Sequence, residues 1–275
     1  MLKITLGCDP EIFVHNKDQK PRSAYGMIPG TKSEPHLVEE GMVQIDGTAL
    51  EFGIDPCSSE DEWVRRINKV MSQMRAMLPK GYDFLHSSSV VFNGNHFRKQ
   101  PKEALELGCE PDYDAYTLQA NPRPVAPPNF RTAGGHVHIG FCEDEKDILG
   151  KAHMDRCATL VKQLDVYLGL PSVLFDRDTR RRRLYGGPGA FRPKSYGCEY
   201  RTLSNSWIED EWKQRFVYRA TTMAIEDLLN GVRGFDGSVA ETDVKDMIKN
   251  SQHYRARNAL RRFKPKLFGE VSKCL

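Results

Sequence analysis

Two histidines separated by one residue, His136 and His138, follow a pair of glycines in TAGGHVHIGF, residues 132–141. In a strand, residues two apart point to the same side, so both imidazoles share one face while Val137 and Ile139 share the other. An isolated pair of this kind fits a solvated sheet face as well as a ligand site. The glycines favour a site, because they let another group approach the backbone closely.

Acidic side chains recur in three other strand-like segments. Asp9 and Glu11 share a side in DPEIFVH if the strand begins that early, and Glu51 is the lone acid of ALEFGI. Glu199 and Arg201 share a face in GCEYRTLSN. Each acid alone is more typical of a solvated sheet residue. Together, carboxylates and imidazoles on four strands supply the ligands that hold Mg²⁺ or Mn²⁺, ions that neutralise a polyphosphate. An arginine beside them would meet developing phosphate charge.

A basic, glycine-rich segment, DRDTRRRRLYGGPGAFRPKS, lies between the two histidines and Glu199. Such charge runs are usually solvated. Its position also suits a flexible grip on phosphate or on a carboxylate substrate through guanidinium contacts. The glycine spacing matches neither a Walker loop nor a Rossmann fingerprint. The basic residues are Arg177, Arg180, Arg181, Arg182, Arg183, Arg192 and Lys194.

Strands are expected to position most of these residues. The first third of the chain predicts strands at LKITL, EIFVH and MVQIDGTALEFGI, the last being a hairpin whose loop is Asp46-Gly47. In that register Val43 faces Leu50 and Ile45 faces Thr48. The hairpin then has an apolar face of Val43, Ile45, Leu50 and Phe52, and a second face of Gln44, Ala49 and Glu51.

Apolar residues at helical spacing predict helices over 58–78 and roughly 144–168, and a mainly helical part from about residue 208. The proline-rich passage 93–131 is too long for an ordinary loop and is expected to be an ordered insertion or a lid. No linker is evident. The pattern predicts a single α+β domain, residues 1–275, built on a largely antiparallel sheet.

The composition is that of a globular protein, with 39% hydrophobic and 28% charged residues. The 40 basic and 37 acidic residues nearly balance, so we expect neither nucleic acid nor a membrane as partner. Seven cysteines without a CxxC pair favour reduced thiols in a cytoplasm. No signal peptide or membrane anchor is evident at the N-terminus. The oligomeric state stays open.

Five ordered motifs resemble one family: GCDPEIF, QIDGTALEFGIDP, CEPDYDAYT, RTAGGHVHIGF and GCEYRTLSNSW. The chain resembles the phage-type carboxylate–amine ligases (COOH.NH2 ligase type 2), distant relatives of glutamine synthetase and glutamate–cysteine ligase. The resemblance implies a curved, largely antiparallel sheet of the glutamine synthetase type with flanking helices. It also implies ATP-dependent activation of a carboxylate to an acyl phosphate, followed by attack of an amine, in the cytoplasm or, for a phage protein, in that of its host.

The resemblance also implies roles for individual residues. It implies a metal site for Mg²⁺ or Mn²⁺ formed by Asp9, Glu11, Glu51, His136 and Glu199. It implies catalytic contacts from Arg201, His138 and Glu51, with His138 nearer the substrate or phosphate. The nucleotide would be bound by Arg201, Arg183, Arg192, Lys194 and Arg131. The partners would be small-molecule or peptide carboxylates and amines.

The chain departs from larger relatives on the first strand, where D-P-E replaces E-x-E, so the number of metals stays open. Asp112 and Asp114 are candidates to supply further ligands or to bind the amine. Two other interpretations remain. One is a metal-dependent hydrolase that uses the same His/Glu face without ATP, and the other is a non-catalytic binding protein on this fold.

Overall fold

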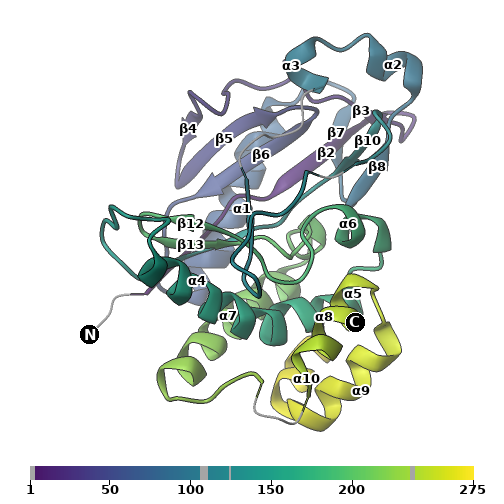
Figure 1. Cartoon of the computed structure of the whole chain (residues 1–275). Helices are drawn as coiled ribbons and strands as arrows, with labels where there is room; N and C mark the ends of the chain where they lie inside the picture. The colour runs from purple at the N-terminus through teal and green to yellow at the C-terminus, as the bar shows by residue number, and fades with distance from the viewer. Residues whose placement is uncertain (1–3, 106–110, 124, 236–238) are drawn as a thin grey trace.

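The structure is a computed structural model that describes residues 4–105, 111–123, 125–235 and 239–275 (Figure 1). Cys109, the start of the predicted strand LKITL and part of the 93–131 segment lie outside the described residues. None of the described helices is long and apolar enough to cross a membrane.

Five strands form the first sheet, in the order β1-β11-β13-β12-β9, and every neighbouring pair is antiparallel. Alternate residues of β11 and β13 are apolar, which gives this sheet one face for the core and one for polar groups. The strands are β1 (Thr5–Cys8), β11 (Val137–Gly140), β13 (Gly197–Tyr200), β12 (Ala190–Lys194) and β9 (Tyr113–Asp114).

The second sheet has the order β3-β2-β6-β5-β4, with β7 paired to β2, and it is also antiparallel. A separate pair, β10 (Phe130–Thr132) and β8 (Ser89–Val91), lies beside it (Figure 1). The strands of the second sheet are β3 (Pro21–Arg22), β2 (Glu11–Asn16), β6 (Ala49–Ile54), β5 (Gly41–Asp46), β4 (His36–Val38) and β7 (Tyr82–Leu85).

The chain passes directly from the first sheet to the second at Asp9-Pro10, between β1 and β2. Backbone hydrogen bonds close the junction: Glu11 N–H donates to Gly134 O at 2.9 Å and Phe52 N–H donates to Pro10 O at 3.2 Å. The strand therefore does not begin at Asp9 as the sequence suggested, because Pro10 has no N–H to donate and marks the change of sheet. The polar faces of both sheets meet here.

The hairpin β5–β6 confirms the predicted faces and corrects the predicted register. Ile45 pairs with Leu50 and Val43 with Phe52, so the loop is Gly47-Thr48 rather than Asp46-Gly47. Gly47 takes a positive φ of 56° as the first loop residue, a conformation that favours glycine. The pairing is displaced by two residues, and a displacement by an even number leaves every side chain on its predicted face.

Helix α1 (Glu60–Met77) covers the apolar face of this hairpin and confirms the helix predicted over 58–78. It begins after Ser59, whose hydroxyl accepts the Glu62 N–H, and three acidic residues occupy its first turn, where the helix dipole favours them. Trp63 is fully buried and stacks on Trp207 with ring centroids 5.6 Å apart.

Helix α4 (Lys151–Leu164) packs behind the first sheet, where Cys157, Val161 and Leu164 join Ile139 in the core. The predicted helix 144–168 was wrong at its start, because residues 144–150 form turns that end at Gly150. Its far end continues through a π-helical turn, Asp165–Gly169, into α5 (Leu170–Phe175).

The other helices are short or lie after residue 210. The segment 93–131 includes α2 (Gly94–Arg98) and α3 (Lys102–Leu105), and α6 (Thr179–Leu184) contains the arginine run. The C-terminal part is helical and packs below the sheets in Figure 1. It consists of α7 (Glu211–Leu229), α8 (Glu241–Lys249), α9 (His253–Phe263) and α10 (Pro265–Ser272). An α+β fold with antiparallel sheets is thus confirmed.

Candidate active site

A row of four residues crosses the polar face of the first sheet. Gly7, His138, Glu199 and Arg192 are cross-strand partners on four adjacent strands, so their side chains share a face. Glu199 is fully buried, and its Oε2 lies 3.5 Å from the Arg192 guanidinium and 3.1 Å from the Lys194 ammonium. The register thus brings an imidazole and two cations to one carboxylate.

Asp9 joins this row from the junction between the sheets. Its Oδ1 lies 3.0 Å from His138 Nε2 and 3.2 Å from His136 Nδ1, and His136 Nδ1 lies 3.4 Å from Glu199 Oε1. Asp9, His138 and Glu199 each offer one ligand atom within 4.8 Å of the others. Asp9 Oδ1 and His138 Nε2 are buried, and within the described residues they pair with each other as ions but make no well-oriented hydrogen bond. Two carboxylate oxygens and an imidazole this close together fit a divalent cation such as Mg²⁺ or Mn²⁺.

The second sheet contributes a group of carboxylates next to Asp9. Glu11 pairs directly with Glu51 across β2 and β6, and Gln44 follows on β5. Asp46 lies two residues beyond Gln44 and forms an ion pair of 2.8 Å with Lys32. One exposed lysine therefore faces several acidic groups.

Burial and mutual repulsion disfavour ionisation of these acids. Burial, then Asp46, raises the pKa of Glu11 to about 7, although the Gly134 N–H donated to its Oε2 at 2.8 Å opposes this. Burial, then Asp9, Asp46 and Glu11, raises the pKa of Glu51 well above its ordinary value. Like charges packed close together favour protonation of one carboxylate or the binding of a cation between them. This observation supports the fit of a divalent ion.

The two histidines differ in charge. Burial and the neighbouring Arg201 lower the pKa of His136 to about 3, so this imidazole is neutral. Burial lowers the pKa of His138, but the Asp9 carboxylate outweighs it and the net change is upward. Burial would raise the pKa of Asp9, yet the two histidines hold it well below its usual range. Metal binding requires a neutral imidazole, so a cation here would displace the proton from His138.

Arg201 stands over the centre of the site. It forms an ion pair with Glu199, its Nε lies 3.5 Å from Asp112 Oδ2, and its Nη1 lies 3.5 Å from His136 Nδ1. The fully buried Arg181 donates to the carbonyl oxygens of Arg201 at 3.1 Å and Thr202 at 2.9 Å. Arg181 thus fixes the backbone that carries Arg201.

A buried carboxylate supports β13 from its other face. Asp165, in the π-helical turn, accepts the Tyr200 hydroxyl at 2.7 Å and the Tyr116 hydroxyl at 2.8 Å. Burial raises the pKa of Asp165 to about 7 against the effect of these donors. Tyr200 lies between Glu199 and Arg201 in sequence, so this network helps to fix the position of the end of β13, where Glu199 lies and which Arg201 follows.

The arginine run is not the flexible segment that the sequence suggested. Arg181 and Arg182 belong to helix α6, and both side chains are fully buried. Arg182 forms an ion pair with Asp176 at 3.2 Å and donates to the Ser172 hydroxyl at 3.0 Å. Arginines can be buried in this way because some of their guanidinium donors find acceptors in the fold, here the Arg201 and Thr202 carbonyl oxygens for Arg181 and Asp176 for Arg182. Arg183 is exposed at the end of the same helix.

The structure brings most of the predicted residues together, but not all of them. Asp9, Glu51 and Glu199 converge with the other residues of the site, whereas Arg131 is occupied elsewhere. Its guanidinium donates to Pro128, Phe130 and Leu105 carbonyl oxygens and lies over the Phe97 ring. Asp114 accepts the N–H of Tyr116 in a turn.

Three neighbours of the site were not predicted as site residues. Asp46 was assigned to the hairpin loop, although its spacing from Gln44 placed it on the face of Glu51. Tyr196 contacts His138 Nδ1 through its hydroxyl. No sequence pattern marked Tyr196 as a site residue, because it lies next to the basic segment that includes Lys194. Lys32 comes from a segment with no strand pattern, and only the fold places it near Asp46.

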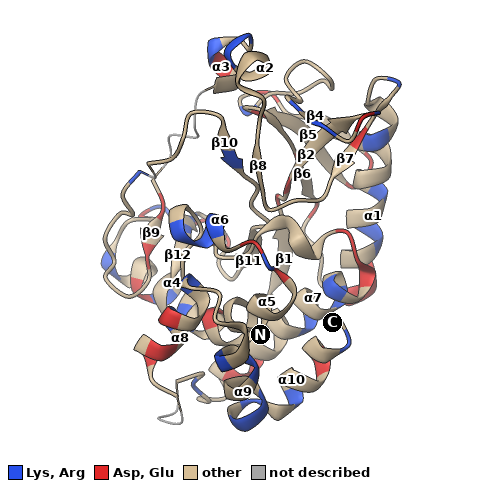
Figure 2. Ribbon diagram, turned by 90° about the vertical axis from the view of Figure 1, so that its right-hand side faces the viewer, with Lys and Arg blue, Asp and Glu red and all other residues tan. Residues whose placement is uncertain are grey.

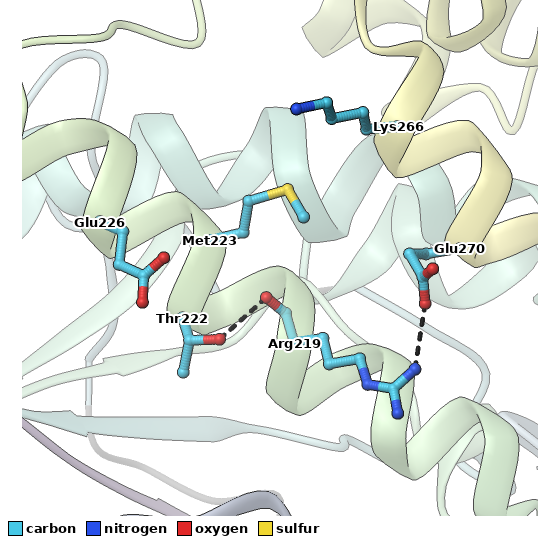
Figure 3. Close-up of a pocket in the computed structure, with 6 residues that line it drawn as sticks. All are labelled: Arg219, Thr222, Met223, Glu226, Lys266 and Glu270. Carbon is cyan, nitrogen blue, oxygen red and sulfur yellow. Dashed lines mark hydrogen bonds and ion pairs between the residues drawn. The ribbon is translucent and has the colours of Figure 1, made fainter.

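The site opens on one side. Arg192, Lys194 and His138 side chains are 20%, 27% and 21% exposed, whereas Glu199 is 0% and His136 is 3% exposed. The exposed side of the site is therefore at β12 and its turn into β13. A cleft of about 540 Å³ lies elsewhere, between α7 and α10 (Figure 3), and its lining includes Arg219 and Lys266 but none of the site residues.

The antiparallel α+β fold and a carboxylate–imidazole–arginine site are compatible with the ligase class that the sequence resembles. Residues 123–233 match the model of a family described as phage phiEco32-like COOH.NH2 ligase-type 2. The resemblance is thereby confirmed over this segment, and it supports an amide-forming carboxylate–amine ligase. The segment includes both histidines, Glu199 and Arg201, whereas Asp9 precedes it.

No curated protein matches the chain. Among solved structures, the crystal structure of a bifunctional glutathione synthetase from Pasteurella multocida aligns with 98% of this chain at 11% sequence identity and a TM-score of 0.49. This chain spans 46% of that one.

Proposed function

We propose that the chain is an ATP-dependent carboxylate–amine ligase on a glutamine synthetase-like fold, which forms an amide or peptide bond through an acyl phosphate. The observation that carries the proposal is the group Asp9, His138 and Glu199, with Arg192, Lys194 and Arg201 around the same carboxylate. Ligands for a divalent cation and cations for a phosphate lie side by side. The family match over residues 123–233 supports the class of reaction.

The reaction has two steps. A carboxylate oxygen attacks the γ-phosphorus of ATP, the bond to the β-phosphate oxygen breaks, and ADP leaves. The amine nitrogen then attacks the acyl carbon, the carbon–oxygen bond breaks, phosphate leaves, and the nitrogen loses a proton. Phosphorylation is needed because a carboxylate is a poor electrophile.

The metal and the basic residues have complementary roles. Asp9 and Glu199 with a histidine would hold Mg²⁺ or Mn²⁺, and Glu11 and Glu51 would hold it or a second ion. The ion, when bound, offsets the charge of the phosphates. Arg201 is placed to stabilise the charge that develops on the transferred phosphoryl group, with Arg192 and Lys194 on the open side of the site.

The geometry bears on which of the two histidines would hold the metal ion. The sequence-based prediction gave the metal to His136 and the substrate to His138. In the structure, His138 belongs to the three-residue ligand group, and His136 Nδ1 is within 3.4 Å of both carboxylates. Metal affinities of the two single variants distinguish the assignments.

We further propose that residues 1–275 act as one domain and that the described part of 93–131, residues 93–105, 111–123 and 125–131, covers the site. Asp112, from this segment, lies 3.5 Å from Arg201, and β9 pairs with β12 at the edge of the first sheet. A cover of this kind would exclude water, which otherwise hydrolyses an acyl phosphate. Six cysteines of the described chain are free, which suits the cytoplasm, where thiols stay reduced. The substrates would be small molecules or peptides.

The test is an ADP-release screen with ATP and Mg²⁺ across amino acids, polyamines and small peptides, with mass spectrometry of the product. We expect release only when a carboxylate and an amine are both present, and ¹⁸O from a labelled carboxylate in the released phosphate. Glu199→Gln abolishes the activity, while Glu34→Gln, an exposed acid, leaves it unchanged. Full turnover without nucleotide would contradict the ligase and favour the hydrolase.

A further inference from the structure

Positive charge is concentrated at the C-terminal end of the chain. Residues 249–275 contain eight basic residues and a single acidic one, whereas the preceding residues contain 32 basic and 36 acidic ones. The near balance of the whole chain therefore hides a local excess. Such an excess creates a potential that attracts anions even when the net charge is small.

Helix α9 presents this charge on one face. Its apolar side, with Ala256 and Leu260, is buried against the rest of the fold. Tyr254, Arg257 and Arg261 follow at helical spacing on the exposed side, and Tyr254 is 77% exposed. Figure 2 shows α9 at the end of the molecule away from β4 and β5, with basic residues along it.

The cations of this face have few partners inside the chain. Arg255 is paired with Asp243 and Asp246 at 2.9 and 2.8 Å, and so is already neutralised. Arg257 forms no ion pair with the described residues, and the Arg261 guanidinium lies over the Phe268 ring. Lys266 continues the charge onto α10, at the rim of the cleft in Figure 3.

The chemistry of the face selects the partner. A membrane-surface helix inserts its apolar side, but the apolar side of α9 is buried in the core. A protein interface needs an apolar centre, and Tyr254 is the one large exposed apolar group on this face. Guanidinium groups beside an exposed aromatic ring match a phosphate backbone whose bases can stack.

We propose that the exposed face of α9, formed by Tyr254, Arg257, Asn258 and Arg261 with Lys266 beside it, binds single-stranded nucleic acid. The arginines and the lysine contact phosphates, and a base stacks on Tyr254. The face lies apart from the candidate active site, and the inference does not depend on the ligase activity. RNA and DNA share this chemistry, so both are tested.

Binding is measured by fluorescence anisotropy of labelled oligothymidylate and oligouridylate, each about 20 nucleotides long, over a series of salt concentrations. We expect a linear fall of log K with log salt. Arg257→Gln with Arg261→Gln removes two phosphate contacts, so the slope becomes shallower by about 1.4. Tyr254→Ala weakens binding about tenfold without changing the slope.

Lys80→Gln with Lys99→Gln is the matched control, because both lysines are exposed on other elements, and this variant binds like wild type. Circular dichroism checks that all variants are folded. The proposal is overturned if wild type does not bind either oligonucleotide at about 50 mM salt, or if the control loses as much affinity. Equal binding of a duplex, or displacement by polyglutamate at the same concentration as by oligonucleotide, also overturns it.

Discussion

Glu11→Gln should make the metal-free protein more stable, although it removes a proposed metal ligand. The carboxyl of Glu11 is opposite Glu51 and near Asp46, and its pKa is about 7 instead of 4.5. Above pH 7 this difference corresponds to about 3 kcal/mol of destabilisation, an upper limit because Glu11 retains some solvent contact. Glutamine keeps the oxygen that accepts the Gly134 N–H.

The pH dependence identifies the cause. Between pH 4.5 and 7 the folded protein holds a proton on Glu11 that the unfolded chain has lost, so the stability of wild type falls as pH rises. The variant lacks this contribution. We expect equal stabilities below pH 4.5 and a gap of about 3 kcal/mol above pH 7, or about 6 to 10 °C in melting temperature.

Thermal and urea unfolding in EDTA at several pH values provides the measurement. Added Mn²⁺ should stabilise wild type by about 3 kcal/mol at a hundredfold excess over its dissociation constant, and stabilise the variant less. Glu34→Gln, on the surface, is the control and shows no gap. A variant no more stable than wild type at high pH, or a gap that persists at pH 4.5, would refute the reasoning.

Three further variants probe other parts of the site. Asp165→Asn should flatten the fall in stability between pH 4 and 7, because the folded pKa of Asp165 is about 7; urea unfolding against pH shows this, and an unchanged profile contradicts it. Arg182→Met leaves Asp176 buried without its cation and should lower the free energy of unfolding, measured in urea, by about 3–5 kcal/mol. A decrease of less than half that size would show that the ion pair is not important for stability. His138→Asn should weaken Mn²⁺ binding, measured by electron paramagnetic resonance, about tenfold or more and further than His136→Asn; the reverse order would restore the sequence-based assignment.

Strand parity made the faces of the candidates within strands predictable from sequence. Alternation within β11 and β13 placed His138 and Glu199 on polar faces, and the register confirms that these faces coincide. The hairpin faces were also right, although its loop was misplaced by one residue. Period-two patterns determine which side a residue faces, and they survive any even displacement of the pairing.

The neighbours of each strand could not be predicted in the same way. His138 and Glu199 are 61 positions apart and meet because β11 pairs with β13, which no local pattern encodes. Asp9 reaches both histidines only because Pro10 ends one sheet and starts another. The burial of Arg181 and Arg182 could not be predicted either. A run of arginines is usually solvated, and only tertiary contacts supply the acceptors that allow these two to be buried.

The acidic and the basic side chains of the site lie on opposite sides of Asp9. Glu11, Glu51 and Asp46 lie on the second sheet, and Arg192, Lys194 and Arg201 lie on the first, with Asp9 at the junction. A divalent cation beside Asp9 would lower the repulsion among the acids, and an anionic phosphate on the other side would release Arg192 and Lys194 from Glu199. A phosphate that carries a bound divalent ion would meet both needs at once, the cation for the acids and the anion for the basic residues. The same arrangement gives an uncharged ligand no comparable gain, and this is the physical reason to expect nucleotide and metal to bind together.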